Sequence, residues 1–161
     1  VLENKDSWYS IGRALREHQE KRIFGISVGL LVYGEGNKIT REQEGLSAFL
    51  EEMGCRSTGQ RIYYAGDIDR AGVGIFYDAK KQNPDLSMEP CLPLYHFMVQ
   101  RALEEKRVLE KCRDKREIGW KREFLEYFPL PYRSFVQQVL EENRRIPQEI
   151  LNYQDYRNMC R

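Results

Sequence analysis

Long hydrophobic runs are missing from this sequence. No apolar stretch approaches the about 18 residues that a membrane-spanning helix needs, so we expect no association with a membrane. No basic segment followed by an apolar one stands at the start, so no targeting peptide is visible and we expect a cytoplasmic protein. The chain opens inside a strand-like run at Val1, and we therefore expect it to be the C-terminal fragment of a longer protein.

C-x-x-C motifs and a surplus of one charge sign are also missing, and histidines are few. No C-x-x-C pair occurs, and no cysteine stands at zinc spacing from either of the two histidines, so we expect four reduced thiols: Cys55, Cys91, Cys112 and Cys160. The net charge of +1 does not indicate a nucleic-acid binder, so only local charge can argue for one. What remains is 161 residues, 41% of them hydrophobic, which suits one globular domain.

Strand-like and helix-like segments alternate over the first two thirds of the chain. The pattern predicts strands at residues 1–2, 26–33, 61–65 and 87–92. Between them it predicts helices at residues 6–22, begun by Asp6 or Ser7, at 40–54, begun by Thr40, and at 71–82. Alternation of this kind predicts the α/β fold class, with a mostly parallel sheet of four strands flanked by helices.

The pattern changes after Pro93. Apolar spacing predicts helices at residues 95–116, 119–128 and 132–143, and a short last helix from Pro147. We therefore expect residues 1–94 to form an α/β core, with residues 95–161 as a helical C-terminal part packed on the same domain.

The most informative local pattern is D-I-D at residues 67–69, between an apolar strand and a helix. Residues two apart in an extended segment point the same way, so Asp67 and Asp69 can converge on one cation. The carboxyl end of a strand is also where open parallel sheets bind ligands. Carboxylate oxygens suit Mg²⁺, and Gly66 and Gly72 permit a tight turn with space for a phosphate. The other interpretation is a turn in which Asp69 only caps the following helix.

Glu3 adds a third carboxylate where the first predicted strand ends. If the first and third strands are neighbours, Glu3 faces Asp67 and Asp69. Three carboxylates at one sheet edge repel one another unless a divalent cation neutralises them, and one of them can acquire a raised pKa and act as a general acid or base.

This sequence resembles TOPRIM domains. Their pattern is a glutamate after the first strand and D-x-D-x-x-G after the third strand. L-E-N-K-D-S-W at residues 2–8 and D-I-D-R-A-G at residues 67–72 are similar to segments of the topoisomerase VI A subunit. A closer resemblance is to the C-terminal TOPRIM domain of the JetD nuclease subunits of Wadjet anti-plasmid systems. It extends over nearly the whole chain and includes Y-A-G-D-I-D (64–69), N-P-D-L (83–86) and R-R-I-P-Q-E (144–149).

The resemblance implies cleavage of double-stranded DNA that depends on Mg²⁺ or Mn²⁺, with Glu3, Asp67 and Asp69 as metal and acid–base residues. It also implies an SMC-like motor complex as partner. The winged-helix domain that carries the catalytic tyrosine of the topoisomerase relatives is missing here, so hydrolysis by water fits better than a tyrosyl–DNA step. A two-fold homodimer would supply one site for each DNA strand.

Further candidates surround these motifs. Gly34 and Gly36 form a loop after the second predicted strand, where Glu35 could join the carboxylates and Lys38 could contact phosphate; an ordinary exposed turn explains the loop equally well. Glu149 starts a helix after Pro147, where it either lies near the metal or only stabilises the helix dipole. The cations that we expect to contact nucleic acid are Lys38, Arg70, Arg144 and Arg145.

Two other functions compete with a nuclease. A TOPRIM-like module could grip DNA or a partner without cutting, in which case Glu3 would be dispensable. A phosphohydrolase with an aspartyl nucleophile also uses D-x-D, but it needs a lysine and further acidic residues after later strands, where this chain is predicted to become helical.

Overall fold

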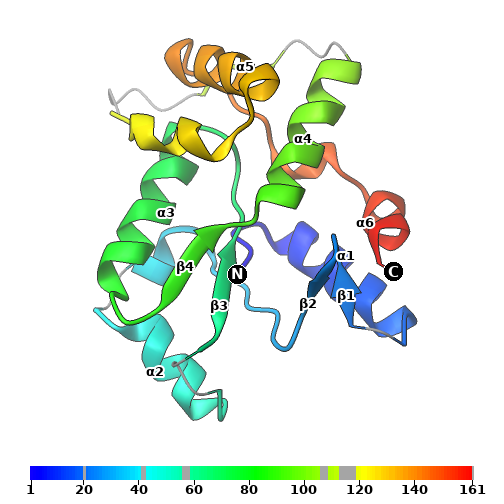
Figure 1. The fold of residues 1–161 in the computed structure, drawn as a ribbon, viewed down its shortest axis with the longest axis vertical. Helices are drawn as coiled ribbons and strands as arrows, with labels where there is room; N and C mark the ends of the chain where they lie inside the picture. Colours follow the sequence, from blue (N-terminus) through cyan, green and yellow to red (C-terminus); the bar gives the residue numbers. More distant parts are fainter. Residues whose placement is uncertain (20, 41–42, 56–58, 106–108, 113–118, 161) are drawn as a thin grey trace.

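Two neighbouring parallel strands, β3 (Arg61–Tyr64) and β4 (Ser87–Pro90), form the centre of the computed structural model (Figure 1). α3 (Arg70–Gln82) connects them, which makes one β-α-β unit. The strands predicted at 61–65 and 87–92 and the helix predicted at 71–82 are thus confirmed. The structure describes residues 1–19, 21–40, 43–55, 59–105, 109–112 and 119–160.

Two further extended segments continue this pair on the β3 side. Leu2 forms parallel bridges with Ala65 on one side and with Tyr33 on the other. The Leu2 amide donates to the Val32 carbonyl over 2.9 Å, and the Gly34 amide donates to the Leu2 carbonyl over 2.8 Å. Residues 1–3 therefore lie between residues 32–34 and β3, which makes the first and third predicted strands neighbours.

The predicted four-stranded sheet is nevertheless wrong in its extent. Within the described residues, β3 and β4 are the two of these four segments that form a ladder, and the other two join through the single bridges of Leu2. The first segment is short because Asn4 already caps α1 (Lys5–Glu17) by accepting a hydrogen bond from the Ser7 amide. The strand predicted at 26–33 is interrupted, because Ile26 and Ser27 pair with residues 22–23 instead.

That other pairing is a small antiparallel hairpin of β1 (Arg22–Ile23) and β2 (Ile26–Ser27). Its turn places Phe24 at φ 53° and Gly25 at φ 75°. Positive φ at both central residues gives the turn a twist that suits a two-residue hairpin. The chain reverses direction here before residues 32–34 return to the parallel segments.

Two helices of the first half differ from their predicted bounds. α1 begins at Lys5 and is capped by Asn4, so the prediction that Asp6 or Ser7 begins it is wrong. α1 ends at Glu17 rather than near residue 22, since the chain then enters the hairpin. Thr40 does not begin a helix: it ends the 3₁₀ segment η1 (Gly36–Thr40), and α2 spans Gly45–Glu52. Residues 41–42 of the predicted helix lie outside the described part of the chain.

The second half is less helical than predicted. α4 (Leu92–Glu104) stops well before residue 116, and Lys111 instead pairs with Arg144 in an antiparallel bridge. The helix predicted at 119–128 is the 3₁₀ segment η2 (Arg122–Tyr127). The remaining elements are α5 (Leu130–Glu141), η3 (Gln148–Ile150) and α6 (Tyr153–Met159). In the part of the chain that is described, no helix is long and apolar enough to cross a membrane.

The C-terminal elements share the hydrophobic core of the first ninety residues. α6 packs on α1, where the Tyr156 hydroxyl donates to Ser7 Oγ over 3.2 Å. The aromatic rings of Tyr95 and Phe124 pack edge to face at 5.7 Å, and Phe76 lies 6.4 Å from Phe124. The boundary predicted at residue 94 stays a prediction.

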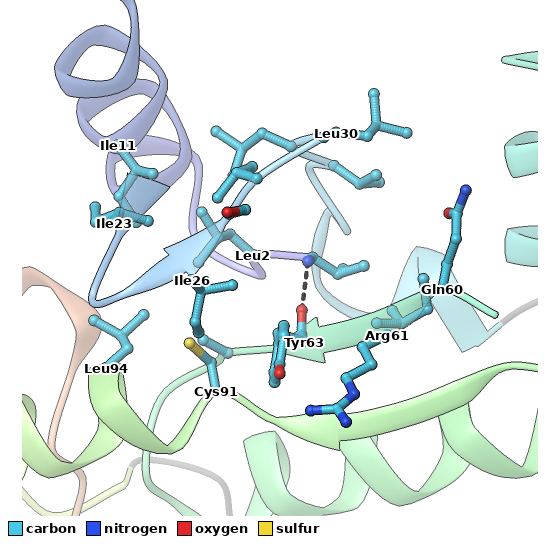
Figure 2. A pocket seen from close by; sticks show the side chains of 18 of the residues that line it. Leu2, Ile11, Ile23, Ile26, Leu30, Gln60, Arg61, Tyr63, Cys91 and Leu94 are labelled. Atoms are coloured by element: carbon cyan, nitrogen blue, oxygen red, sulfur yellow. Dashed lines mark hydrogen bonds between the residues drawn. The ribbon is translucent and has the colours of Figure 1, made fainter. Parts of the chain in front are cut away.

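An apolar cavity of about 690 Å³ lies beside the parallel segments, between the hairpin, residues 28–32 and α2 (Figure 2). Aliphatic side chains dominate its wall, and the Val1 amino group donates to the Tyr63 carbonyl at its edge. None of Glu3, Asp67 and Asp69 lines this cavity, so it is separate from the predicted site.

Asn83 joins α2 to the end of α3. Its fully buried side chain accepts hydrogen bonds from the amides of Leu46 (3.1 Å) and Ser47 (3.2 Å), and it donates to the Ala79 carbonyl (2.9 Å). It therefore caps α2 from outside that helix, whose own N-cap residue, Glu44, supplies no side-chain cap.

We expect Asn83→Ala to lower the free energy of unfolding by about 2 kcal/mol, because it leaves the Leu46 and Ser47 amides at the start of α2 without their acceptor. Urea denaturation measures the change. The exposed Asn158 on α6 is the matched control, and Asn158→Ala should stay within about 0.5 kcal/mol of the wild type. Equal effects of the two substitutions would contradict this role for Asn83.

Candidate functional site

The pairing of Leu2 with Ala65 brings Glu3 to the D-x-D segment. The Glu3 amide donates to the Ala65 carbonyl over 3.0 Å, and the Ala65 amide donates to the Val1 carbonyl over 3.0 Å. Glu3 and Asp67 therefore follow adjacent parallel segments at their carboxyl ends, as the sequence predicts. This is the sheet edge at which α/β proteins bind ligands.

The Glu3 carboxylate lies across the backbone of Gly66. A Cβ atom at position 66 would stand 2.2 Å from Glu3 Oε2, so glycine is what allows this approach. The buried Tyr64 hydroxyl donates to Oε2 over 2.9 Å, and the Gly66 amide donates to the buried Tyr95 hydroxyl over 3.0 Å. Two buried tyrosines thus hold the Glu3 carboxylate and the Gly66 backbone beneath it in place.

Asp67 is held by the C-terminal segment. Its Oδ1 accepts a hydrogen bond from the Gln148 amide over 2.8 Å, and its Oδ2 lies 3.6 Å from Arg145 Nη1. Between the two aspartates, Ile68 pairs antiparallel with Ile146 through backbone hydrogen bonds of 3.0 and 3.1 Å. A segment almost eighty residues away in sequence therefore forms part of the D-x-D loop's support.

Asp69 is the N-cap of α3, so it does cap the following helix, and its role toward a metal stays a prediction. Its Oδ1 accepts from the Gly72 amide over 2.7 Å, and its Oδ2 accepts from Cys112 Sγ over 3.8 Å. A Cβ atom at Gly72 would lie 2.3 Å from the Asp67 carbonyl oxygen. Gly72 therefore permits a close approach of the protein's own backbone, which is how the loop turns into the helix.

Burial and neighbouring negative charge raise the pKa of Glu3 from 4.5 to about 7. Burial is the largest cause. The charges of Asp67, Asp69 and Glu149 raise the pKa further, while the hydrogen bond from Tyr64 acts in the opposite direction. We call Glu3, Asp67, Asp69 and Glu149 the carboxylate cluster, because their charges act on one another.

Asp67 is shifted in the same direction. Burial, followed by the charges of Glu149 and Asp69, raises its pKa from 3.8 to about 6, against the stabilising hydrogen bond from Gln148 and the positive charge of Arg145. Two neighbouring carboxyls with raised pKa values mean that burial, and repulsion between the carboxylates, disfavour the ionised forms at this edge.

Glu149 joins the cluster from η3. It is exposed, and its Oε1 accepts a hydrogen bond from Asn4 Nδ2 over 2.6 Å. Asn4 also caps α1, so this bond connects the start of the chain to the C-terminal segment next to Glu3. Glu35 follows Gly34 at the same sheet edge, but its side chain is exposed and its backbone lies at φ 52°.

The predicted cations fall into different surroundings. Arg70 donates to the carbonyls of Leu140 and Glu141 at the end of α5, over 2.7 and 2.9 Å. Arg144 donates to the Leu109 carbonyl and to Glu142. These contacts give both arginines a structural role, and their contact with nucleic acid stays a prediction.

Arg145 is the predicted cation that lies against the carboxylate cluster, with 43% of its side chain exposed. Lys38 belongs to η1, and its side chain lies outside the part of the chain that the structure describes. Contact of either residue with nucleic acid likewise stays a prediction.

The donor set fits a hard divalent cation in its chemistry. Carboxylate oxygens are what Mg²⁺ binds, and each carboxylate has about four lone-pair positions, so its present partners leave capacity for a metal. Over the described residues, however, no group of three or more histidine, cysteine, aspartate or glutamate side chains is arranged to hold a metal ion. A metal at this edge therefore requires the carboxylates to turn toward it.

Three supporting residues were not identified from the sequence. Tyr64 could have been found, because alternation along β3 places it with Ile62 on the buried side. Tyr95 and Cys112 gave no signal, since both fell inside one long predicted helix. Their roles depend on contacts with Gly66 and Asp69 that no local pattern encodes.

Comparison with known proteins shows the family of the chain. A family model described as "Wadjet protein JetD, C-terminal" matches residues 3–160, which includes the whole carboxylate cluster. No curated protein and no solved structure matched the chain.

Two glycines of α3 provide a test of the loop geometry. We expect Gly72→Ala to destabilise the protein by at least about 1 kcal/mol, because its Cβ would collide with the Asp67 carbonyl. Gly74, in the same helix, has open space around its Cβ position, so Gly74→Ala should stabilise by about 0.5 kcal/mol. Thermal denaturation of both variants measures these changes, and a Gly72→Ala variant at least as stable as the wild type would show that the loop is not tightly constrained.

The raised pKa values predict how stability depends on pH without metal. A carboxyl whose pKa is raised by folding stabilises the folded state while protonated, and this contribution is lost as the pH rises through the folded-state pKa. In EDTA, we therefore expect the wild type to lose stability relative to Glu3→Gln between pH 4.5 and about 7. Urea denaturation across this interval measures the difference.

The exposed Glu51 of α2 serves as the control for this pH dependence. Glu51→Gln should follow the wild type at every pH. A constant difference between the wild type and Glu3→Gln over the interval would mean that the Glu3 carboxyl is not shifted.

Proposed function

The chain belongs to the family of the C-terminal domain of JetD, a protein of the Wadjet defence system, and from this premise we propose that it is a metal-dependent DNA endonuclease domain of TOPRIM type. The observation that carries the proposal is the meeting of Glu3 with Asp67 and Asp69 at one sheet edge. There the charges of both aspartates raise the pKa of Glu3. The substrate is double-stranded DNA.

Asp67 and Asp69 would hold Mg²⁺ or Mn²⁺, with Glu3 beside them. When bound, the metal lowers the pKa of a water molecule and stabilises the negative charge that develops on the phosphate. The α3 cap keeps Asp69 in place through Gly72, and the Gln148 amide keeps Asp67 in place. The other oxygen of each aspartate, Oδ2, contacts Cys112 Sγ in Asp69 and Arg145 Nη1 in Asp67, and it would exchange that weak contact for the metal.

Glu3 is suited to proton transfer. Its Oε2 accepts a hydrogen bond from the Tyr64 hydroxyl. Oε1 is therefore the oxygen that takes or gives a proton. A pKa of about 7 lies close to neutral pH, where both protonation states are populated and a general acid or base is most effective. Glu3 would therefore deprotonate the attacking water or protonate the leaving oxygen.

Membership in a Wadjet family implies partner subunits, and we propose that an SMC-like motor complex delivers the DNA to this site. We also propose that two copies of the domain act on the two strands, since a two-fold arrangement matches the symmetry of duplex DNA. Both proposals concern contacts with a second molecule, so the assembled system is what tests them.

Plasmid cleavage in Mg²⁺ by the full protein with its partner subunits tests the function. We expect Glu3→Gln and Asp67→Asn to reduce the cleavage rate by about 10²-fold or more while the protein stays folded. Gly66→Ala should act like Glu3→Gln, because its Cβ displaces the flexible Glu3 carboxylate rather than the backbone.

Glu51→Gln is the control, since α2 lies at the far end of β3 from the carboxylate cluster (Figure 1). It should cleave like the wild type. DNA binding without cleavage by the wild type in any divalent metal, with all partners present, would favour a non-catalytic binding module. Cleavage that survives Glu3→Gln would place the catalytic site elsewhere.

A further inference from the structure

The Arg145 side chain lies beside the carboxylate cluster and forms a long ion pair with one of its members, Asp67. Its Nη1 lies 3.6 Å from Asp67 Oδ2, which is an ion pair but longer than a normal hydrogen bond. Within the described residues, the guanidinium group forms no hydrogen bond, and 43% of the side chain is exposed. Most of its N–H donors therefore face solvent at the site.

The backbone beneath this side chain is fixed. The Arg145 amide donates to the Glu110 carbonyl over 3.1 Å, and the next residue, Ile146, is fully buried and pairs with Ile68. The side chain of the preceding Arg144 donates hydrogen bonds to the Leu109 carbonyl and to the Glu142 carboxylate. The Arg145 backbone is thus held by hydrogen bonds, whereas its side chain is long and partly exposed. The guanidinium lies next to Asp67, one of the two aspartates of the D-x-D loop.

A partly exposed ion pair of this kind contributes little to stability, so the guanidinium can leave Asp67 easily. A divalent cation that binds Asp67 competes directly with Arg145 for the same carboxylate. The guanidinium fork, in turn, matches a phosphate better than it matches a single carboxylate oxygen at 3.6 Å.

We propose that Arg145 binds the scissile phosphodiester, and that it is held against Asp67 until a divalent cation takes that carboxylate. The inference rests on the proposed function and adds to it a phosphate-binding residue. Arg145 has opposite effects on the two ligands: it weakens metal binding at Asp67, and it strengthens the interaction with the phosphate in the transition state.

The test measures both effects on the same variants. Isothermal titration of the protein with Mg²⁺ should show binding by Arg145→Ala about two- to fivefold tighter than by the wild type, since the competing charge is gone. Plasmid cleavage at saturating Mg²⁺, with the partner subunits, should fall by about 10- to 100-fold in the same variant, because a charged hydrogen bond to phosphate is lost. Arg145→Lys keeps the charge and should recover part of the cleavage with wild-type Mg²⁺ affinity.

Arg157→Ala is a matched control. Arg157 also forms a 3.6 Å ion pair with a carboxylate, that of Glu17, and 53% of its side chain is exposed, but it lies on α6 outside the cluster. It should leave both measurements unchanged. Denaturation of each variant establishes that the fold is retained.

Two results would overturn the inference while the proposed function stands. One is wild-type cleavage by Arg145→Ala at saturating Mg²⁺. The other is weaker Mg²⁺ binding by this variant, which would mean that Arg145 only supports Asp67. Failure of the function itself looks different: the wild type would bind no Mg²⁺ or would cleave no DNA, and the inference would fall with it.

Discussion

The backbone pairing of Ile68 with Ile146 is the contact on which the site depends most. Both residues are fully buried, and their two hydrogen bonds of 3.0 and 3.1 Å lie between Asp67 and Asp69. This pairing brings the Gln148 amide and the Arg145 side chain to Asp67. Without it, the D-x-D loop would be an exposed connection between β3 and α3, and Asp67 would lose the contacts that set the direction of its carboxylate.

The carboxylate cluster illustrates how a fold can concentrate charge that it does not itself neutralise. The first and third segments place Glu3 over Gly66, and the core tyrosines hold it there. Burial then raises the pKa of the carboxyl to about 7. Such an arrangement disfavours the ionised form without a ligand, and binding of a cation or a proton relieves the cost.

The strand ends and the carboxylates were predictable from the sequence, whereas their supports were not. Glu3, Asp67 and Asp69 follow apolar runs, but the adjacency of the first and third segments, which brings them together, was only a condition of the sequence argument. The strand lengths were overestimated, because the capping of α1 by Asn4 and the hairpin turn at Phe24 compete locally with strand formation. The supports from Cys112 and Gln148 are long-range backbone and side-chain contacts, for which helical periodicity predicted the wrong element.

The most direct test of a metal-dependent catalytic site is a crystal structure of the protein soaked in Mn²⁺, read by anomalous scattering. We expect one Mn²⁺ peak bounded by Glu3, Asp67 and Asp69, with the Arg145 guanidinium displaced from Asp67. Manganese prefers the same oxygen ligands as magnesium, so its position reports the catalytic ion. A carboxylate cluster that stays empty at saturating Mn²⁺, or a peak bound elsewhere on the chain, would contradict this account.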